Sequence, residues 1–409
     1  MGMGILTPEV RAPSPPPVDV DRLRANRLGR LVAQLVVHDV ELAVLTNPVS
    51  LRYAADWREY LPYQSHIQTY TLFVEPTGPG GAAALTLHGA YGTDHPVIQE
   101  FRPTHGLNGF DGGLDQRVRI GRFVDDVVAV VGTSARVAVE QLNPSAALAL
   151  ADRGLTVVDA EPLIERAKFV KSPEEVSCLR HSIAVAEVAL HAMRAAVERP
   201  AGITENELFA ILHHVNVAND GDWIDGRMLC SGPRTNPWYQ QATDRVIEPG
   251  DLVAIDTDMV GPMGYSADIS RTWLAGAADG ARPTPEQCDR YRRAYDEITH
   301  NAALLAPGRT FAELTGSAFR QREEFVANRY TCLAHGVGLT DEYPRIVHRQ
   351  DWDREGYDGQ LQVGNVVTVE SFVGSDRGGP GVKLEDMYLI TDDGAERLST
   401  FPFEPELAG

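Results

Sequence analysis

Acidic residues and one histidine stand inside short apolar runs in the C-terminal half of the chain. Burying a charged side chain is costly unless it is paired or coordinates a metal ion, so such positions indicate a metal centre. The candidate ligands are Asp256, Asp258, Asp268, His335, Glu370 and Glu385. Carboxylates with one imidazole suit divalent Mn, Fe, Co or Zn. This many acids predicts two ions bridged by shared carboxylates, whereas ordinary surface acids would explain each residue alone but not the whole set.

Strands must position these side chains. Asp256 and Asp258 are two residues apart, which predicts that one strand presents both on the same face. Asp268 is expected to oppose them across a hairpin with the turn GPMGY. Glu370 and Glu385 are expected to face each other across a second hairpin, closed by the turn SDRGGPG.

The rest of the C-terminal half predicts an α+β domain at residues 169–409. A long amphipathic helix is expected at 171–198, with Ser172 as N-cap and Pro173 in the first turn. A second helix is expected after Thr204. Short strands joined by Gly/Pro turns follow from Met228, with helices inserted at 285–306 and 310–326.

The N-terminal half predicts an α/β domain at residues 1–168. A Pro-rich arm at 1–17, either disordered or draped on the protein, precedes a helix at about 18–38. Strands and helices then alternate. The expected strands are 41–46, 68–75, 82–89 and 135–140, and a helix is expected at 144–152.

Composition narrows the class of protein. A chain of 409 residues favours two domains, and the net charge of −20 argues against nucleic acid or an anionic membrane as a partner. The four cysteines show no metal-binding or disulfide spacing, which predicts reduced thiols. The sequence has no signal-peptide pattern and no apolar run of about 20 residues, so we expect a cytoplasmic protein.

The stretch from about Lys171 to Glu404 resembles the peptidase M24, or pita-bread, family. The flanks that carry this resemblance are DISRTW after Asp268, HGVG at His335, VES at Glu370 and KLED at Glu385. The family's dinuclear ligand order is Asp, Asp, His, Glu, Glu, which the resemblance places at Asp258, Asp268, His335, Glu370 and Glu385. It also implies a creatinase-like N-terminal domain.

Two positions differ from the peptidases of that family. They carry a histidine where this chain has Trp238, and a second where it has Asp341. A peptidase needs hydrogen-bond donors for its oxyanion, and an ionised Asp is only an acceptor. Asp341 is better suited to abstract a proton.

A closer resemblance is to the family's non-peptidase branch of dimethylsulfoniopropionate lyases. The segments SGPRTNPW, DTD, DISRTW, HGVGLTDE and KLED carry it. The branch implies that Asp256 also binds metal, that Asp341 is the catalytic base and that Tyr330 lines the substrate pocket. It further implies iron as the metal and a homodimer.

The predicted function is therefore metal-dependent cleavage of the C–S bond of dimethylsulfoniopropionate, or of a related small carboxylate, by β-elimination. Two divalent ions would bind the substrate carboxylate and acidify the adjacent C–H bond. Aromatic rings would hold the sulfonium by cation–π contact, with Trp238, Tyr330 and Tyr343 as candidates. An Xaa-Pro dipeptidase or aminopeptidase, and an inactive pita-bread binding module, are the alternatives.

Overall fold

The computed structural model describes residues 10–59, 61–78, 80–89 and 94–408, so the first nine residues of the predicted arm lie outside the described residues. Contacts divide the chain into two compact units. The N-terminal unit is Asp19–Lys168, and the C-terminal unit is Phe169–Gly409 together with the segment before Asp19. The described part of the arm is tied to this second unit, because Asn219 donates to the carbonyl of Val10 at 2.6 Å and accepts from the amide of Ala12 at 3.0 Å.

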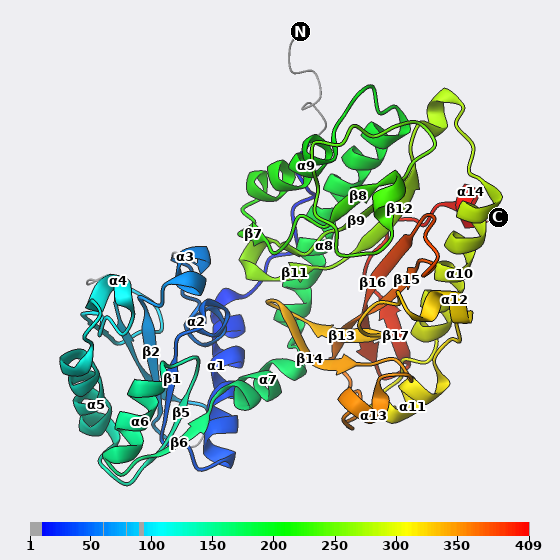
Figure 1. Cartoon of the computed structure of the whole chain (residues 1–409). Coiled ribbons are helices and arrows are strands. Elements are labelled where there is room, and N and C mark those ends of the chain that lie inside the picture. The colour runs from blue at the N-terminus through cyan, green and yellow to red at the C-terminus, as the bar shows by residue number, and fades with distance from the viewer. Residues whose placement is uncertain (1–9, 60, 79, 90–93, 409) are drawn as a thin grey trace. The chain divides into compact units, whose positions relative to one another are not determined.

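The N-terminal unit is a six-stranded mixed sheet in the order β4-β3-β2-β1-β5-β6, with helices packed on it (Figure 1). The central strand β1 is wholly buried, pairs parallel with β5 and pairs antiparallel with β2. Apolar residues of α5 and α6 pack against β1 and β5 to form its core. The strands are β1 (Leu42–Leu45), β2 (Thr71–Pro76), β3 (Ala83–His88), β4 (Glu100–Arg102), β5 (Arg136–Val139) and β6 (Thr156–Asp159). The helices are α1 (Val20–Val37), α2 (Pro48–Ala55), α3 (Leu61–His66), α4 (Gly109–Gly112), α5 (Arg117–Val131), α6 (Pro144–Asp152) and α7 (Glu161–Phe169). The predicted α/β class is confirmed.

The C-terminal unit begins with two long helices whose starts are defined by their caps. Helix α8 (Pro173–Glu198) has Ser172 as N-cap in a capping box with Glu175, and α9 (Glu205–Ala218) has the same arrangement at Thr204. Both starts agree with the sequence-based expectation. Helix α10 spans Pro285–Ala302.

The single helix predicted at 310–326 is wrong. The structure has two short helices there, α11 (Phe311–Ser317) and α12 (Glu323–Val326). Ala318 leaves the helical conformation with ψ of 152°, and the amide of Phe319 donates to the side chain of Asn301 at 2.9 Å. A tertiary hydrogen bond thus replaces the next helical one.

Three small sheets complete this unit, as expected for the α+β class. Their orders are β14-β13-β15-β16-β17, β12-β9-β8 and β11-β10-β7. The hydroxyl of Thr272 joins the first two, since it donates to the carbonyl of Lys383 at 2.9 Å and accepts from its amide at 3.0 Å. The strands are β7 (Trp223–Ile224), β8 (Leu229–Ser231), β9 (Leu252–Asp256), β10 (Met259–Val260), β11 (Ser266–Ala267), β12 (Ser270–Leu274), β13 (Ala334–Val337), β14 (Asp341–Ile346), β15 (Val366–Val373), β16 (Val382–Thr391) and β17 (Gly394–Arg397). The short helices α13 (Trp352–Glu355) and α14 (Pro405–Ala408) lie near its end.

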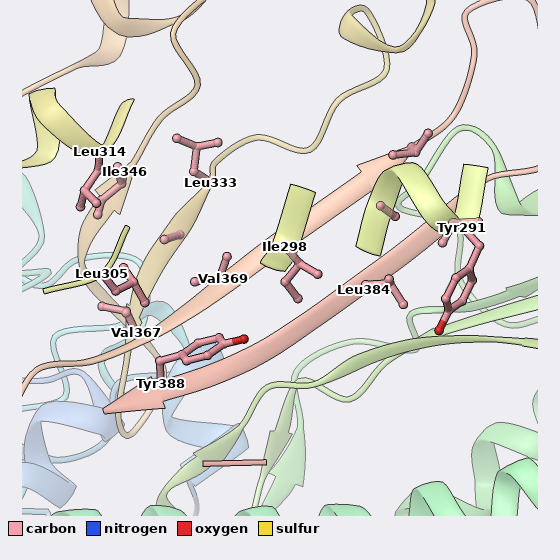
Figure 2. Packing of buried hydrophobic residues seen from close by; sticks show 14 of the residues in the cluster. Tyr291, Ile298, Leu305, Leu314, Leu333, Ile346, Val367, Val369, Leu384 and Tyr388 are labelled. Carbon is pink, nitrogen blue, oxygen red and sulfur yellow. The ribbon is translucent and has the colours of Figure 1, made fainter. Parts of the chain in front are cut away.

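Side chains along β15 and β16 point alternately to an apolar core face and to a polar face. Tyr291 and Ile298 of α10 belong to the same buried cluster as Val367 and Val369 of β15 and Leu384 of β16 (Figure 2). Because side chains alternate across a strand, the intervening residues of both strands point to the opposite face. That face carries the charged residues described below.

Two expectations from composition can be compared with the structure. The four cysteines form no disulfide with one another, and Cys178, Cys230 and Cys332 are buried, which agrees with reduced thiols. In the part of the chain that the structure describes, no helix is long and apolar enough to cross a membrane.

One buried acid predicts a pH-dependent stability. Burial raises the pKa of Glu297 on α10 from 4.5 to about 7, although Ser371 and Gln321 donate to its carboxylate at 2.5 and 2.9 Å. The folded state therefore binds this proton more tightly than the unfolded state, and stability falls as pH rises from about 4.5 to about 7. Glu297→Gln, whose amide oxygen can keep both hydrogen bonds, should raise the free energy of unfolding by up to about 3 kcal/mol at pH 8 and much less at pH 5. Urea unfolding at both pH values tests this, with the exposed Glu323→Gln as control.

Candidate metal centre

Four strands bring acids and a histidine together on the polar face. Glu370 of β15 and Glu385 of β16 are directly opposite each other in the antiparallel register, as predicted. His335 lies on β13, which pairs with β15, and Asp268 lies between β11 and β12. Asp256 ends β9 opposite Ser270.

The imidazole of His335 is the point on which these acids converge. Its Nε2 lies 3.3 Å from Glu370 Oε1, 3.5 Å from Asp268 Oδ2 and 3.7 Å from Glu385 Oε1. Its Nδ1 lies 3.0 Å from the carbonyl oxygen of Gly336, a contact that fixes the ring orientation. Asp256, Asp268 and Glu385 form a second group whose ligand atoms lie within 4.8 Å of one another.

Asp258 departs from the expected strand geometry. Strand β9 ends at Asp256, and Asp258 has a positive φ of 37°, so one strand does not present both acids by simple alternation. This expectation is wrong because the backbone turns between β9 and β10. Asp258 nevertheless interacts electrostatically with the cluster. Burial is the main cause that raises its pKa well above the usual value, and the negative charges of Asp256 and Glu385 add to it.

The arrangement fits divalent metal ions. Asp256 Oδ1, Asp268 Oδ1 and Glu385 Oε1 are buried and have no hydrogen-bond partner among the described residues. Burial, and then Glu385 and Asp256, raises the pKa of Asp268 well above its ordinary value. Unpaired, desolvated carboxylate oxygens beside an imidazole are the donor set that a hard or borderline cation would satisfy.

A buried lysine is the functional residue that sequence reasoning missed. Lys383 Nζ donates to Glu370 Oε2 and Glu385 Oε2, both at 2.8 Å, and to Ser270 Oγ at 2.9 Å, and it lies 3.4 Å from Asp256 Oδ2. Burial alone would lower the pKa of Lys383, but the three carboxylates hold it well above the ordinary value. The chain has only three lysines, and this one interrupts an apolar strand two residues before Glu385. That placement was the available signal.

Glu370 and Glu385 each contact two positive groups, one through each oxygen of the carboxylate. The Oε1 atoms of Glu370 and Glu385 face His335, and their Oε2 atoms accept from Lys383. The lysine fixes the orientation of both side chains. Oxygens on the His335 side remain available for a metal ion.

Asp341 lies at the rim of the cluster. It is the first residue of β14, and its Oδ1 is 3.7 Å from His335 Nδ1. Its side chain retains 73% of its exposure, unlike the buried ligands. Desolvation raises the pKa of Asp341. The negative charges of Glu370 and Glu385 raise it further, and His335 acts in the opposite direction. It is thus a carboxylate that reaches both the cluster and solvent.

The turn that carries Asp341 is held by close backbone packing and one buried ion pair. A Cβ on Gly336 would lie 2.3 Å from the carbonyl oxygen of Tyr343, and one on Gly338 would lie 2.5 Å from Glu342 Oε1. Glu342 accepts from Lys171 Nζ at 2.8 Å and from the amide of Leu339 at 2.9 Å. The glycines of HGVG are therefore needed for the approach of β14 to β13.

Two of the three predicted aromatic residues lie beside Lys383. Its Nζ is 4.5 Å from the ring centroid of Tyr330 and 6.0 Å from that of Trp238. Tyr330 also stacks on Tyr239 at 5.4 Å, and Tyr239 is 52% exposed. Tyr239, which the sequence analysis did not select, is thus an exposed ring next to the site. The signal was present in its position beside Trp238.

The third aromatic, Tyr343, lies in a different environment. Its ring contacts are with Phe169, Phe311 and Tyr357, at centroid distances of 5.1, 5.8 and 5.7 Å. It is partly buried and packs against the main apolar core. The structure therefore places it in core packing and not with Tyr330 and Trp238.

Neighbours of the ligands form a second set of contacts. Arg271 Nη2 donates to Asp386 at 2.8 Å with both side chains fully buried, and its Nη1 donates to the carbonyl of Glu385 at 2.7 Å. Cys332 Sγ lies 3.3 Å from Glu370 Oε1. These contacts hold the strand that carries Glu385 and cover Glu370.

The fold and the site together define a metalloenzyme of the pita-bread type. A model of the metallopeptidase family M24 matches residues 177–392. The chain belongs to this family, which confirms the resemblance seen in the sequence.

Two curated relatives match nearly the whole chain. Dimethylsulfoniopropionate lyase DddP of Roseovarius nubinhibens is 34% identical over 400 residues, covering 96% of this chain and 89% of the relative. The protein of the same name from Roseobacter denitrificans is 31% identical and covers 96% and 88%. The Xaa-Pro dipeptidase of Pyrococcus furiosus is 30% identical over 58% of this chain and 65% of its own length.

Solved structures agree on the fold. The Xaa-Pro dipeptidase of Bacillus anthracis superposes with a TM-score of 0.72 at 21% identity, over 92% of this chain and 98% of the other. The dipeptidase PepE of Mycobacterium ulcerans gives 0.69 at 23% identity, over 94% and 97%. At these identities the likeness establishes the two-domain fold alone.

The contacts of Lys383 predict how its replacement changes the stability of the metal-free protein. Lys383→Met would leave Glu370 and Glu385 without their shared cation, and removing one partner of a buried ion pair typically costs about 3–5 kcal/mol. The metal-stripped variant should lose about that much free energy of unfolding in urea. Lys383→Arg, which keeps the charge, is the control. An unchanged urea midpoint for Lys383→Met would show that the lysine does not balance these acids.

Proposed function

We propose that the protein is a metal-dependent carbon–sulfur lyase that converts dimethylsulfoniopropionate, or a closely related sulfonium carboxylate, to acrylate and dimethyl sulfide. The observation that carries the proposal is Asp341, an exposed carboxylate 3.7 Å from the histidine of the candidate metal centre. The two DddP lyases that match 96% of the chain support it.

Asp341 acts as the general base. Its carboxylate takes a proton from the carbon next to the substrate carboxylate, and the electron pair of that C–H bond forms the new C=C bond. The C–S bond breaks, and its electron pair leaves with sulfur as dimethyl sulfide. A positioned base of this kind typically contributes about 10²–10⁴ in rate.

The metal ligands in this proposal are Asp256, Asp258, Asp268, His335, Glu370 and Glu385. Bound divalent ions would supply Lewis acidity at the substrate carboxylate, which makes the adjacent C–H bond more acidic. Two ions are proposed, with iron as the metal and Mn, Co or Zn as alternatives. Lys383 and His335 hold the glutamates in place, and Gly336 and Glu342 hold the turn of Asp341.

Trp238 and Tyr330 are the proposed aromatic contacts for the sulfonium group, whereas Tyr343, also selected from the sequence, packs against Phe169, Phe311 and Tyr357. Tyr330 and Trp238 have Lys383 near their rings, at 4.5 and 6.0 Å, so the substrate cation must approach from another direction. The exposed ring of Tyr239, stacked on Tyr330, offers such an approach. We therefore add Tyr239 to Trp238 and Tyr330. Each cation–π contact would contribute about 0.5–2 kcal/mol.

An Xaa-Pro peptidase is the second candidate, favoured by the dipeptidase relative that matches 58% of the chain. A peptidase would need a donor to stabilise the oxyanion where Trp238 and Asp341 stand. Among the described residues, His335 is the histidine present in the clusters at this centre. The elimination therefore fits these side chains better.

We further propose that the protein is a cytoplasmic homodimer that acts on a small molecule and not on nucleic acid or membranes. Size-exclusion chromatography with light scattering would test the oligomeric state.

The base assignment predicts the effect of Asp341→Asn. The amide cannot accept a proton at neutral pH, so release of dimethyl sulfide from dimethylsulfoniopropionate should fall by about 10²–10⁴ while bound metal is unchanged. Headspace gas chromatography and metal analysis measure the two quantities.

Asp353→Asn, an exposed acid on α13, is the matched control and should keep full activity. Hydrolysis of an Xaa-Pro dipeptide with added Mn²⁺ by the wild-type protein, without release of dimethyl sulfide, would favour the peptidase. Lyase activity that survives in Asp341→Asn would show that another group is the base.

The metal content gives a further prediction. Purified wild-type protein should hold about two more ions per chain than Glu370→Gln/Glu385→Gln, because both glutamates that would hold the ions lose their charge. Elemental analysis measures this difference, and chelator treatment followed by Fe²⁺ should restore lyase activity. Equal metal content in the two proteins would instead support an inactive binding module.

A further inference from the structure

We propose that His88, His105 and Asp126 form a second metal site, in the N-terminal unit, that binds one zinc-class divalent ion. The three residues come from β3, from the loop after β4 and from α5. One ligand atom from each lies within 4.8 Å of the other two. The site belongs to the sheet domain and does not rest on the proposed lyase activity.

The two imidazoles are buried and stacked. Their ring centroids are 4.1 Å apart with a tilt of 30°, and His88 and His105 are 1% and 8% exposed. Phe73 packs on His88 at 4.6 Å, and Phe123 packs edge-on against His105 at 5.1 Å. The apolar rings hold both imidazoles close together, and binding of one ion requires one ring to turn within this pocket.

Three of the four ring nitrogens lack a hydrogen bond. His105 Nε2 pairs with Asp126 Oδ2 at 2.8 Å. His105 Nδ1 and both ring nitrogens of His88 are buried and have no hydrogen-bond partner within the described part of the chain, although the carbonyl of Pro103 lies beside His88. A buried polar group without a partner costs about 1–3 kcal/mol, and an ion held by one nitrogen of each ring would remove part of that cost.

Burial and the neighbouring charges act on both imidazoles. Burial and the neighbouring His105 lower the pKa of His88 to about 3, and burial also lowers the pKa of His105 despite Asp126. Burial thus acts against a charge on either imidazole. The nearby guanidinium of Arg102 is paired with Glu100 at 2.8 and 2.9 Å.

The donor set indicates the class of ion. Two imidazole nitrogens and one carboxylate oxygen, with a fourth position open to solvent, is a common arrangement for zinc. The side chain of Asp126 is 41% exposed, so water can reach that fourth position. In tetrahedral zinc sites the ligand atoms are roughly 3.3 Å apart. His105 Nε2 and Asp126 Oδ2 are 2.8 Å apart, so a small outward movement of the aspartate would bring these two atoms to that separation.

The test must separate this site from the metal centre of the C-terminal unit. The full-length Glu370→Gln/Glu385→Gln protein, stripped with chelator, provides a background in which that centre is weakened. It should bind one equivalent of Zn²⁺ by calorimetry, and one equivalent of Co²⁺ with the visible absorption of a four-coordinate ion. Adding Asp126→Asn should weaken Zn²⁺ binding by more than the about 10- to 100-fold that outer-shell partners contribute.

Controls keep the outcome decisive. Asp125→Asn changes the adjacent exposed acid of α5, which pairs with Arg153, and should leave Zn²⁺ binding unchanged. His88→Phe, if folded by circular dichroism, should abolish binding, and in the wild-type background it should not alter release of dimethyl sulfide. Failure of the double variant to bind Zn²⁺ or Co²⁺, or equal binding by the Asp126→Asn and Asp125→Asn proteins, would overturn the proposal.

Discussion

The structure of the C-terminal unit depends on how a concentration of buried negative charge is balanced. Asp256, Asp268, Glu370 and Glu385 are each no more than 4% exposed, and carboxylates in that environment are stable only beside positive charge. Lys383 and His335 supply part of that charge from opposite sides of the two glutamates. Orphaned oxygens remain after both contacts are counted, so the side chains alone do not complete the site. Divalent ions would complete it, and the contacts of Lys383 orient Glu370 and Glu385 without them.

Strand geometry brings the buried carboxylates and the positive groups that balance them together at one site. Neighbours along β15 and β16 point alternately to the helix-covered core and to the charged face, so Val369 and Leu384 stabilise the same strands that present Glu370 and Glu385. Arg271 fixes β16 from its other face through Asp386 and the carbonyl of Glu385. The ligands are therefore carried by the most buried elements of the unit. Asp341, in contrast, begins β14 directly after the turn from β13, and its side chain is exposed.

Much of this could be predicted from the sequence, because the deciding signals were local. Capping residues located α8 and α9, and acids inside apolar runs located Asp268, Glu370 and Glu385. Features that depend on the tertiary path were missed. The turn after Asp256, the break at Ala318 and the packing of Tyr343 each follow from contacts distant in sequence. The cluster of His88, His105 and Asp126 is of the same kind, since no motif joins residues that come from a strand, a loop and a helix.

The contrast between the ligands and Asp341 explains how one fold can support different reactions. A ligand must be buried and oriented, and it loses its freedom as a base once it is bound to cations. A base must keep a lone pair that faces substrate and must exchange its proton with solvent. Asp341 meets this condition because its carboxylate is 73% exposed while the backbone beside it is fixed by Glu342 and Lys171. A histidine at that position could donate a hydrogen bond to an oxyanion, whereas an ionised aspartate can only accept one. If Asp341 is the base as proposed, the group at the rim sets the reaction while the buried charges below it stay the same.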